Sequence, residues 1–353
     1  MSVKILHCAD IHLDSVFSFL SPSAAQCRRE DLRSAFSKCV ALAKEKDADI
    51  FIISGDLFDS ENVSRDTAEF VRKKLAQISD KEVYICAGNH DPFKTSSYLS
   101  VMNFGENVHI FSGETECIKR EEYDIYGVSF TEPYARKSFL EGFKAENPDK
   151  LNIMVMHGDF TSNDYNLITK TQLENCGIDY MALGHVHTHE VIKAGRCTAV
   201  YPGCPEGRGF DETGQKGAVY AEVSKSGVKL EFVPVSRRKL HETVIDVTEA
   251  ENSEEITNML KGSIKDENDL YKFVLKGETD IKISGDVLKD NLNAFFVKIY
   301  DRTEPKKDLE KFAEEFSLKG LFVKKVLSEI ENGGDEELIK LALKIGLDAM
   351  NGR

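Results

Sequence analysis

Short apolar runs alternate with amphipathic stretches through the first half of the chain. Apolar residues at helical spacing predict helices over residues 24–46, 64–78 and 136–143, and Ser64 is a suitable N-cap for the second. This alternation of strands and helices predicts an α/β fold. The apolar runs are short, as expected for buried strands, and cover residues 3–6, 49–53, 82–86, 153–156 and 180–183.

The second half of the chain has a different organisation. Short strands with Gly-rich turns follow residue 190, and the polar stretch near residues 236–240 indicates a domain boundary. Residues 241–302 predict strand, helix, strand, helix and strand. Amphipathic helices are expected over residues 306–330 and 335–350. The predicted parts of the chain are therefore residues 1–237, 238–302 and 303–353.

Composition and charge narrow the class of protein. Hydrophobic residues make up 41% and charged residues 30% of the 353 positions, which is typical of a soluble globular enzyme. No apolar run approaches the roughly 20 residues that cross a bilayer, and the start predicts a strand rather than a signal peptide. The eight cysteines include no CxxC pair, so we expect free thiols and a cytoplasmic protein. The net charge of −14 is spread along the chain, and no basic domain indicates nucleic-acid binding.

Five short polar blocks stand directly after predicted strands. Each contains a side chain that can bind a metal, and most contain a glycine. In open α/β sheets, ligands bind beyond the carboxyl ends of the strands. The blocks are Asp10-Ile11-His12, Gly55-Asp56, Gly88-Asn89-His90-Asp91, His157-Gly158 and Gly184-His185-Val186-His187.

Taken singly, each block has an ordinary structural explanation. Asp, Asn and Gly are common in turns, and a lone histidine is more often a hydrogen-bonded polar residue than a ligand. The last block is more specific, because on an extended segment His185 and His187 point to the same side. Five such blocks in this order, each after a strand, favour one shared metal site.

The residue types in these blocks indicate the chemistry. Oxygen and imidazole ligands suit Mn²⁺, Fe²⁺ or Zn²⁺, and the lack of cysteine argues against structural zinc. Hydrolysis of a phosphate diester needs a hydroxide near neutral pH and stabilisation of the charge that builds up on the phosphoryl group. Two cations about 3.5–4 Å apart provide both. We therefore predict a phosphoesterase with two divalent metal ions.

The order of the blocks resembles the calcineurin-like metallophosphoesterase superfamily, whose pattern is D-x-H, G-D, G-N-H-D or G-N-H-E, H and G-H-x-H. Within it, the chain is similar to SbcD-type DNA repair exonucleases, on the stretches 7–15, 55–59 and 201–208. The resemblance implies a four-layer αββα sandwich. It also implies that a smaller α+β capping domain, here residues 238–302, follows the sandwich and admits DNA. C-terminal helices would come after the capping domain.

The resemblance also implies roles for individual residues. His90 would contact the scissile phosphate and protonate the leaving oxygen. Mn²⁺ is the expected metal, with Fe²⁺ or Zn²⁺ as alternatives. Seven side chains would hold the two ions: Asp10, His12 and His187 the first, Asn89, His157 and His185 the second, and Asp56 both.

Two further positions bear on the activity. Asp59 stands where several relatives carry a second histidine, which weakens the case for any activity that needs that histidine but not for metal binding. Asp59-Ser60-Glu61 also replaces the D-R-G of phosphoprotein phosphatases, which argues against that class. Arg208 is a candidate contact for substrate phosphate, although a surface arginine is usually only solvated.

A metal-dependent DNA nuclease in repair, with exonuclease or endonuclease activity, is the leading hypothesis. The alternative is a phosphodiesterase or phosphatase acting on small molecules or nucleotides, which the evenly spread acidity favours. A scaffold that has lost catalysis is a third hypothesis, and the complete ligand set argues against it.

The resemblance also implies partners. DNA is the expected substrate, and no membrane is expected. The C-terminal helices would dock onto a coiled-coil ATPase of the SbcC type, although packing of these helices on their own domain is an equal alternative. Assembly as a homodimer is compatible with this hypothesis.

Overall fold

The computed structural model describes residues 2–306, 309–332 and 336–350. Backbone packing divides the chain into two units. The first comprises Met1–Glu242 with Asn268–Tyr271, and the second comprises Thr243–Glu267 with Lys272–Arg353. All five polar blocks belong to the first unit.

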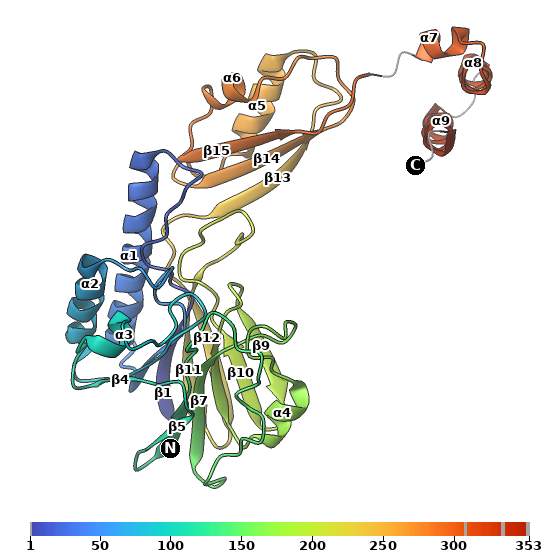
Figure 1. Ribbon diagram of the computed structural model, residues 1–353. Coiled ribbons are helices and arrows are strands. Elements are labelled where there is room, and N and C mark those ends of the chain that lie inside the picture. Colours follow the sequence, from blue (N-terminus) through green and yellow to red (C-terminus); the bar gives the residue numbers. More distant parts are fainter. Residues whose placement is uncertain (1, 307–308, 333–335, 351–353) are drawn as a thin grey trace. The chain divides into compact units, whose positions relative to one another are not determined.

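Two six-stranded sheets form the centre of the first unit (Figure 1). In each sheet four neighbouring strands are parallel and antiparallel strands complete the edges. The first sheet has the order β12 (Gly227–Pro234), β11 (Gly217–Ser224), β1 (Val3–Cys8), β2 (Ile50–Ser54), β3 (Glu82–Cys86) and β4 (Val108–Ile110). The second has the order β5 (Glu116–Lys119), β6 (Tyr123–Gly127), β7 (Leu151–His157), β8 (Tyr180–Gly184), β10 (Cys197–Tyr201) and β9 (Glu190–Ala194).

Helices cover the outer faces of both sheets (Figure 1). Helices α1 (Pro22–Glu45), α2 (Arg65–Leu75) and α3 (Tyr98–Val101) lie along the first sheet, and α4 (Lys170–Asn175) lies beside the second. Strand β2 shows how the layers form: Phe51 and Ile53 join the core on the helix side, whereas Ile50 and Ile52 join the core between the sheets. Side chains alternate in this way because successive residues of a strand point to opposite faces. The predicted four-layer αββα arrangement is confirmed.

Capping residues explain where the two long helices begin. Ser21 precedes Pro22 at the start of α1, and its side chain accepts a hydrogen bond from the Ala24 amide. Ser64 caps α2 by accepting from the Thr67 amide, as its sequence position predicts. Each cap satisfies a backbone donor that has no partner within its helix.

The helix predicted over Arg136–Phe143 is wrong. The Ala135 amide donates to the Asp164 carbonyl at 2.8 Å, and the Phe139 amide donates to the Asn166 side chain at 2.8 Å. These bonds to a distant loop leave the segment with isolated turns, in which the Glu141 amide donates to the Ser138 carbonyl and the Phe143 amide to the Leu140 carbonyl, and no helix. Its helix-like apolar spacing arises because Phe139, Leu140 and Phe143 pack on the core outside the second sheet.

Residues 240–301 follow the predicted order of strand, helix, strand, helix and strand. Their three-stranded sheet contains β13 (Leu240–Asp246), β14 (Leu270–Lys276) and β15 (Phe296–Asp301), joined by α5 (Ser253–Ser263) and α6 (Gly285–Lys289). All of these residues except 240–242 and 268–271 belong to the second unit. The elements are therefore those of a small α+β fold.

Among the described residues after 302 there are three helices rather than the predicted two. A break at Ser317, which caps the following helix through the Gly320 amide, separates α7 (Leu309–Glu314) from α8 (Leu318–Glu331). The last helix is α9 (Glu336–Met350). Residues 307–308, at the predicted start of this region, and residue 335, at the predicted start of the last helix, lie outside the described residues. Among the residues described, no helix is both long and apolar enough to cross a membrane.

Candidate metal centre

The polar blocks meet at the carboxyl ends of five parallel strands. Because β1, β2 and β3 are neighbours in one sheet and β7 and β8 in the other, the loops after them converge between the sheets. The structure brings all seven predicted ligands into this region: Asp10 and His12 after β1, Asp56 after β2, Asn89 after β3, His157 at the end of β7, and His185 and His187 after β8.

The backbone at this site is held in an unusual conformation. Asp10, His12 and Asp56 have φ angles of 52°, 50° and 50°, in the left-handed region that non-glycine residues seldom occupy. The first two loops are tied together, because the His12 amide donates to the Asp56 carbonyl at 3.0 Å. Such strain persists only where the surroundings enforce it, and it concentrates at functional sites.

Two glycines leave room for the acidic and imidazole side chains. A Cβ at Gly88 would lie 2.2 Å from Oδ1 of Asp56. At Gly55, whose φ is +91°, a Cβ would lie 2.2 Å from Nδ1 of His157. The glycines of the G-D and G-N-H-D blocks are therefore required by close packing around the ligands.

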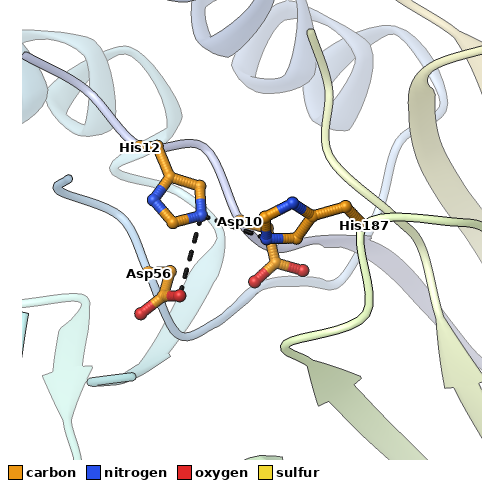
Figure 2. A group of neighbouring side chains, drawn as sticks. All are labelled: Asp10, His12, Asp56 and His187. Carbon is orange, nitrogen blue, oxygen red and sulfur yellow. Dashed lines mark hydrogen bonds and ion pairs between the residues drawn. The ribbon is translucent and has the colours of Figure 1, made fainter. Parts of the chain in front are cut away.

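Figure 2 shows the first group of ligands, Asp10, His12, Asp56 and His187. One ligand atom from each of these side chains lies within 4.8 Å of all the others. Nε2 of His12 is 3.3 Å from Nε2 of His187 and 3.6 Å from Oδ2 of Asp56. All but His187 are buried, so the group forms an enclosed set of oxygen and nitrogen donors.

The second group surrounds the side chain of Asn89. Its Oδ1 lies 3.0 Å from Nε2 of His157 and 3.1 Å from Nδ1 of His185. Nε2 of His157 is also 3.5 Å from Oδ2 of Asp56. The same oxygen of Asp56 therefore faces both groups, which is the position that a bridging carboxylate needs.

The surroundings favour an ionised Asp56 and a neutral His185. Burial alone would raise the pKa of Asp56, but His157, His12 and His90 around it lower this pKa to about 2. Burial and the nearby His157 lower the pKa of His185 to about 4. A carboxylate and unprotonated histidines are the forms that bind metal ions.

Hydrogen bonds to the far side of two histidine rings fix their orientation. Nδ1 of His157 lies 3.0 Å from the Ser54 carbonyl, and Nδ1 of His187 lies 2.7 Å from Oε1 of Glu212. Both partners are acceptors, so Nδ1 carries the hydrogen and Nε2 is free to bind a metal. Burial works against protonation of His187, yet its bond to Glu212 leaves the pKa of His187 above the usual value.

Glu212 is a site residue that the sequence did not predict. Its buried carboxylate also accepts the Arg208 amide at 2.6 Å. No local motif marks this residue, because it lies in an irregular loop and reaches His187 only in the folded chain. Its place in the Gly-rich loop after β10, close behind Arg208, was the one available indication.

His90 and Arg208 lie at the mouth of the centre. The His90 amide donates to Oδ1 of Asp56 at 2.9 Å, and its exposed ring places Nδ1 3.0 Å from the Asp59 carbonyl. The guanidinium of Arg208 is 2.6 Å from Asp59 and 3.3 Å from Glu212. Arg208 is thus held beside the ligands, and is not a merely solvated surface residue.

These residues fit divalent cations. The centre offers carboxylate, amide and imidazole donors, and the Nε2 atoms of His12 and His187 face each other across 3.3 Å with Asp56 beside them. Such a set of oxygen and nitrogen donors, without thiolate, suits first-row divalent metals in a catalytic site.

Residues 3–189 match the calcineurin-like phosphoesterases. The chain belongs to this family. It is 29% identical over 275 residues to the metallophosphoesterase YhaO of Bacillus subtilis, across 73% of this chain and 67% of that protein. It is also 26% identical to the DNA double-strand break repair protein Mre11 of Methanopyrus kandleri, over 73% of this chain and 62% of that protein. The chain is 24% identical to the DNA double-strand break repair protein Mre11 of Sulfolobus acidocaldarius, over 83% of this chain and 79% of that protein.

Family membership and the ligand cluster together establish the general activity. Calcineurin-like phosphoesterases are metal-dependent hydrolases, and the first ligand group is a metal-competent cluster within the matched residues. The protein is a metal-dependent phosphoesterase.

Proposed function

We propose that the protein is a two-metal phosphodiester hydrolase that cuts DNA during repair, as an exonuclease or endonuclease of SbcD type. The observation that carries this proposal is the position of Asp56. Its Oδ2 lies 3.6 Å from Nε2 of His12 in one ligand group and 3.5 Å from Nε2 of His157 in the other. One carboxylate oxygen shared by two donor sets is what a pair of neighbouring cations requires.

We propose Mn²⁺ for both positions, with Fe²⁺ or Zn²⁺ as the alternatives, because oxygen and imidazole ligands suit these ions. When bound, such ions acidify a water molecule and neutralise phosphate oxygens. The protein's own contribution is to fix the ligands in place before substrate arrives. Glu212 and the Ser54 carbonyl set two imidazole rings, and Asp91 holds the loops by accepting the Gly88 and Phe58 amides.

His90 is the proposed proton donor. The Asp59 carbonyl can only accept, so the hydrogen of a neutral His90 ring resides on Nδ1. Nε2 then remains available on an exposed residue and can carry a proton to the leaving oxygen. The backbone bond from His90 to Asp56 keeps this ring next to the ligands.

Arg208 is the proposed phosphate contact. Asp59 and Glu212 fix its guanidinium beside His187, and about a fifth of its side chain is exposed. A planar guanidinium with donors left over can bind a phosphate oxygen and adds positive charge to an acidic protein. Asp59, in the place of the second histidine of several relatives, therefore acts through Arg208.

Similarity beyond the catalytic core supports DNA as the substrate. The matches to both Mre11 proteins cover more of the chain than residues 3–189. They are long enough to take in segments outside the phosphoesterase core, such as the loop around Arg208 and parts of the second unit. We also propose that β13–β15 with α5 and α6 form the capping domain that admits DNA. The proposed location of the protein is the cytoplasm.

The C-terminal helices are proposed to bind a coiled-coil ATPase of the SbcC type. Leu318 and Leu321 of α8 are 75% and 68% exposed, and Leu341 and Ile345 of α9 are 53% and 59% exposed. Exposed apolar residues on successive turns are typical of a surface that a partner helix covers. A homodimer through the same helices is the competing assembly.

A substrate comparison tests the proposed function. Purified protein with Mn²⁺ is offered end-labelled single- and double-stranded DNA, and in parallel a small chromogenic phosphate diester. We expect cleavage of both DNA and the diester, with DNA binding weakened steeply by salt. Hydrolysis of the small diester without any cleavage of DNA would instead support a small-molecule phosphodiesterase, which the net charge of −14 favours.

A further inference from the structure

An aromatic stack extends from a metal ligand to the protein surface. The ring of Tyr165 lies 4.6 Å from the ring of His185, at an interplanar angle of 35°. The ring of Tyr134 continues the stack, 5.9 Å from Tyr165 at 32°. Tyr165 is half-buried, whereas Tyr134 is 57% exposed. Tyr134 therefore places an exposed aromatic ring two ring contacts from the centre.

The backbone holds this tyrosine stack rigidly. Residues 134–136 pair with residues 164–166, through bonds from the Ala135 amide to the Asp164 carbonyl and from the Asn166 amide to the Ala135 carbonyl. Asn166 is fully buried with φ of +51°, and its side chain donates to the His157 carbonyl at 2.7 Å. The platform formed by Tyr134 and Tyr165 is thus linked through Asn166 to the metal ligand His157.

Packing alone explains Tyr165 but not Tyr134. Tyr165 covers one face of His185 and shields that ligand from water. Tyr134 leaves more than half of a large aromatic side chain in solvent, and Arg136 lies over its ring at 6.0 Å. Arg136 is itself 77% exposed while paired with Asp164, and the next residue, Lys137, is 82% exposed while paired with Glu141. Exposed aromatic rings beside exposed cations are the combination that binds single nucleic-acid strands.

We propose that a nucleobase next to the scissile phosphate stacks on Tyr134, at the end of the stack formed with Tyr165 and His185. This inference rests on the proposed function, because it places the base while the metal centre holds the phosphate. Every base has a flat aromatic face, so the platform would bind strands of any sequence. It would favour substrates with a base beside the cleaved bond over simple diesters.

The test uses the Mn²⁺-loaded protein and short single strands with phosphorothioate linkages, which are cleaved slowly. One base at a time is replaced by 2-aminopurine, whose fluorescence falls on stacking and which is read without interference because the chain has no tryptophan. Wild type and Tyr134→Phe should quench the probe at one position near the end of the strand. Tyr134→Leu should lose the quenching and bind about tenfold more weakly. Tyr220→Leu is the matched control, since it removes another tyrosine with a cation over its ring, on β11.

An abasic strand makes the test specific. Removing the base at the quenched position should weaken binding to wild type by about the same factor, with no further loss in Tyr134→Leu. The opposite outcome is that Tyr134→Leu and wild type quench the 2-aminopurine fluorescence equally and bind the strands equally while the protein still cleaves DNA. In that case the stacking inference is wrong and the proposed function stands. If the metal-loaded protein neither binds nor cleaves any strand, the proposed function fails and the platform has no nucleobase to bind.

Discussion

At the scale of single residues, the centre depends on side chains that each serve two neighbours. Asp56 faces both ligand groups, and Glu212 holds both His187 and Arg208. Dual roles of this kind make the effects of substitution specific. A change at Asp56 reaches both metal positions, whereas a change at Glu212 reaches only the position that includes His187.

Glu212→Gln should therefore weaken one metal position and spare the other. The amide keeps the size of the side chain but loses the charge that stabilises the His187 ring, and loss of such a partner typically costs 10- to 100-fold in affinity. Calorimetric titration of the metal-free variant with Mn²⁺ measures both positions. Glu69→Gln, which removes a carboxylate from α2, is the control. Equal weakening of both positions, or none, would show that Glu212 does not act through His187.

His90→Gln should keep two bound ions and lose most hydrolysis. Glutamine cannot deliver a proton near neutral pH, so turnover should fall on the order of 100-fold. Metal content and hydrolysis of a nitrophenyl diester are measured on the same sample. His109→Gln on β4, whose histidine pairs with Glu116, should leave both unchanged. Turnover near the wild-type rate would rule out His90 as the proton donor.

At the scale of elements, the site is built by turns that directly follow strands. In the turn after β2, Gly55 has φ of +91° and lies against His157. This close approach explains why the polar blocks pair a ligand with glycine. It also explains why the sequence revealed the site: the strand, the glycine and the ligand are consecutive in the chain.

Gly55→Ala should destabilise the protein by clearly more than backbone strain alone. The added Cβ would meet Nδ1 of His157 at 2.2 Å, in addition to the strain of the positive φ. Gly142→Ala is the matched control, since Gly142 also has positive φ, +72°, but no atom lies within 4 Å of its added Cβ. Strain of this kind costs about 1 kcal/mol or more. Urea denaturation should show the larger loss for Gly55→Ala, and equal losses would argue against the clash.

The sequence correctly predicted the elements whose conformation depends on residues close by in the chain. Strand β3 and the cap Ser64 follow from nearby residues, and both appear where expected. The helix predicted over 136–143 does not form because the amides of Ala135, just before it, and Phe139, within it, bond to residues 164–166, contacts that no local spacing reports. Glu212 was missed for the same reason, since it meets His187 only after folding.

At the scale of the whole molecule, buried polar groups between the sheets couple stability to pH. Burial lowers the pKa of His7 to about 3, with a smaller contribution from His189. The His7 ring lies 2.7 Å from the Ser54 hydroxyl and 3.1 Å from the Tyr180 hydroxyl. Folding therefore requires a neutral imidazole, while the unfolded chain takes up a proton below about pH 6.5.

Acid should therefore destabilise the metal-free protein from about pH 6.5 downward. The unfolded state binds one more proton than the native state between the two pKa values, so the free energy of unfolding falls by up to about 1.4 kcal/mol per pH unit. The decrease in the free energy of unfolding that His7 causes ends near pH 3. Urea denaturation at several pH values should show a shallower slope in His7→Gln, which has no group to titrate. If the free energy of unfolding of His7→Gln depends on pH as steeply as that of wild type, His7 is not a cause of the acid destabilisation.

Seven side chains are proposed to hold two cations, with Asp56 between them. The most direct test is a crystal structure of the Mn²⁺-loaded protein with anomalous scattering recorded at the manganese edge. We predict two peaks, one among Asp10, His12 and His187 and one among Asn89, His157 and His185, both absent in Asp56→Asn. A single peak, no peak, or two peaks that persist in Asp56→Asn would contradict the account.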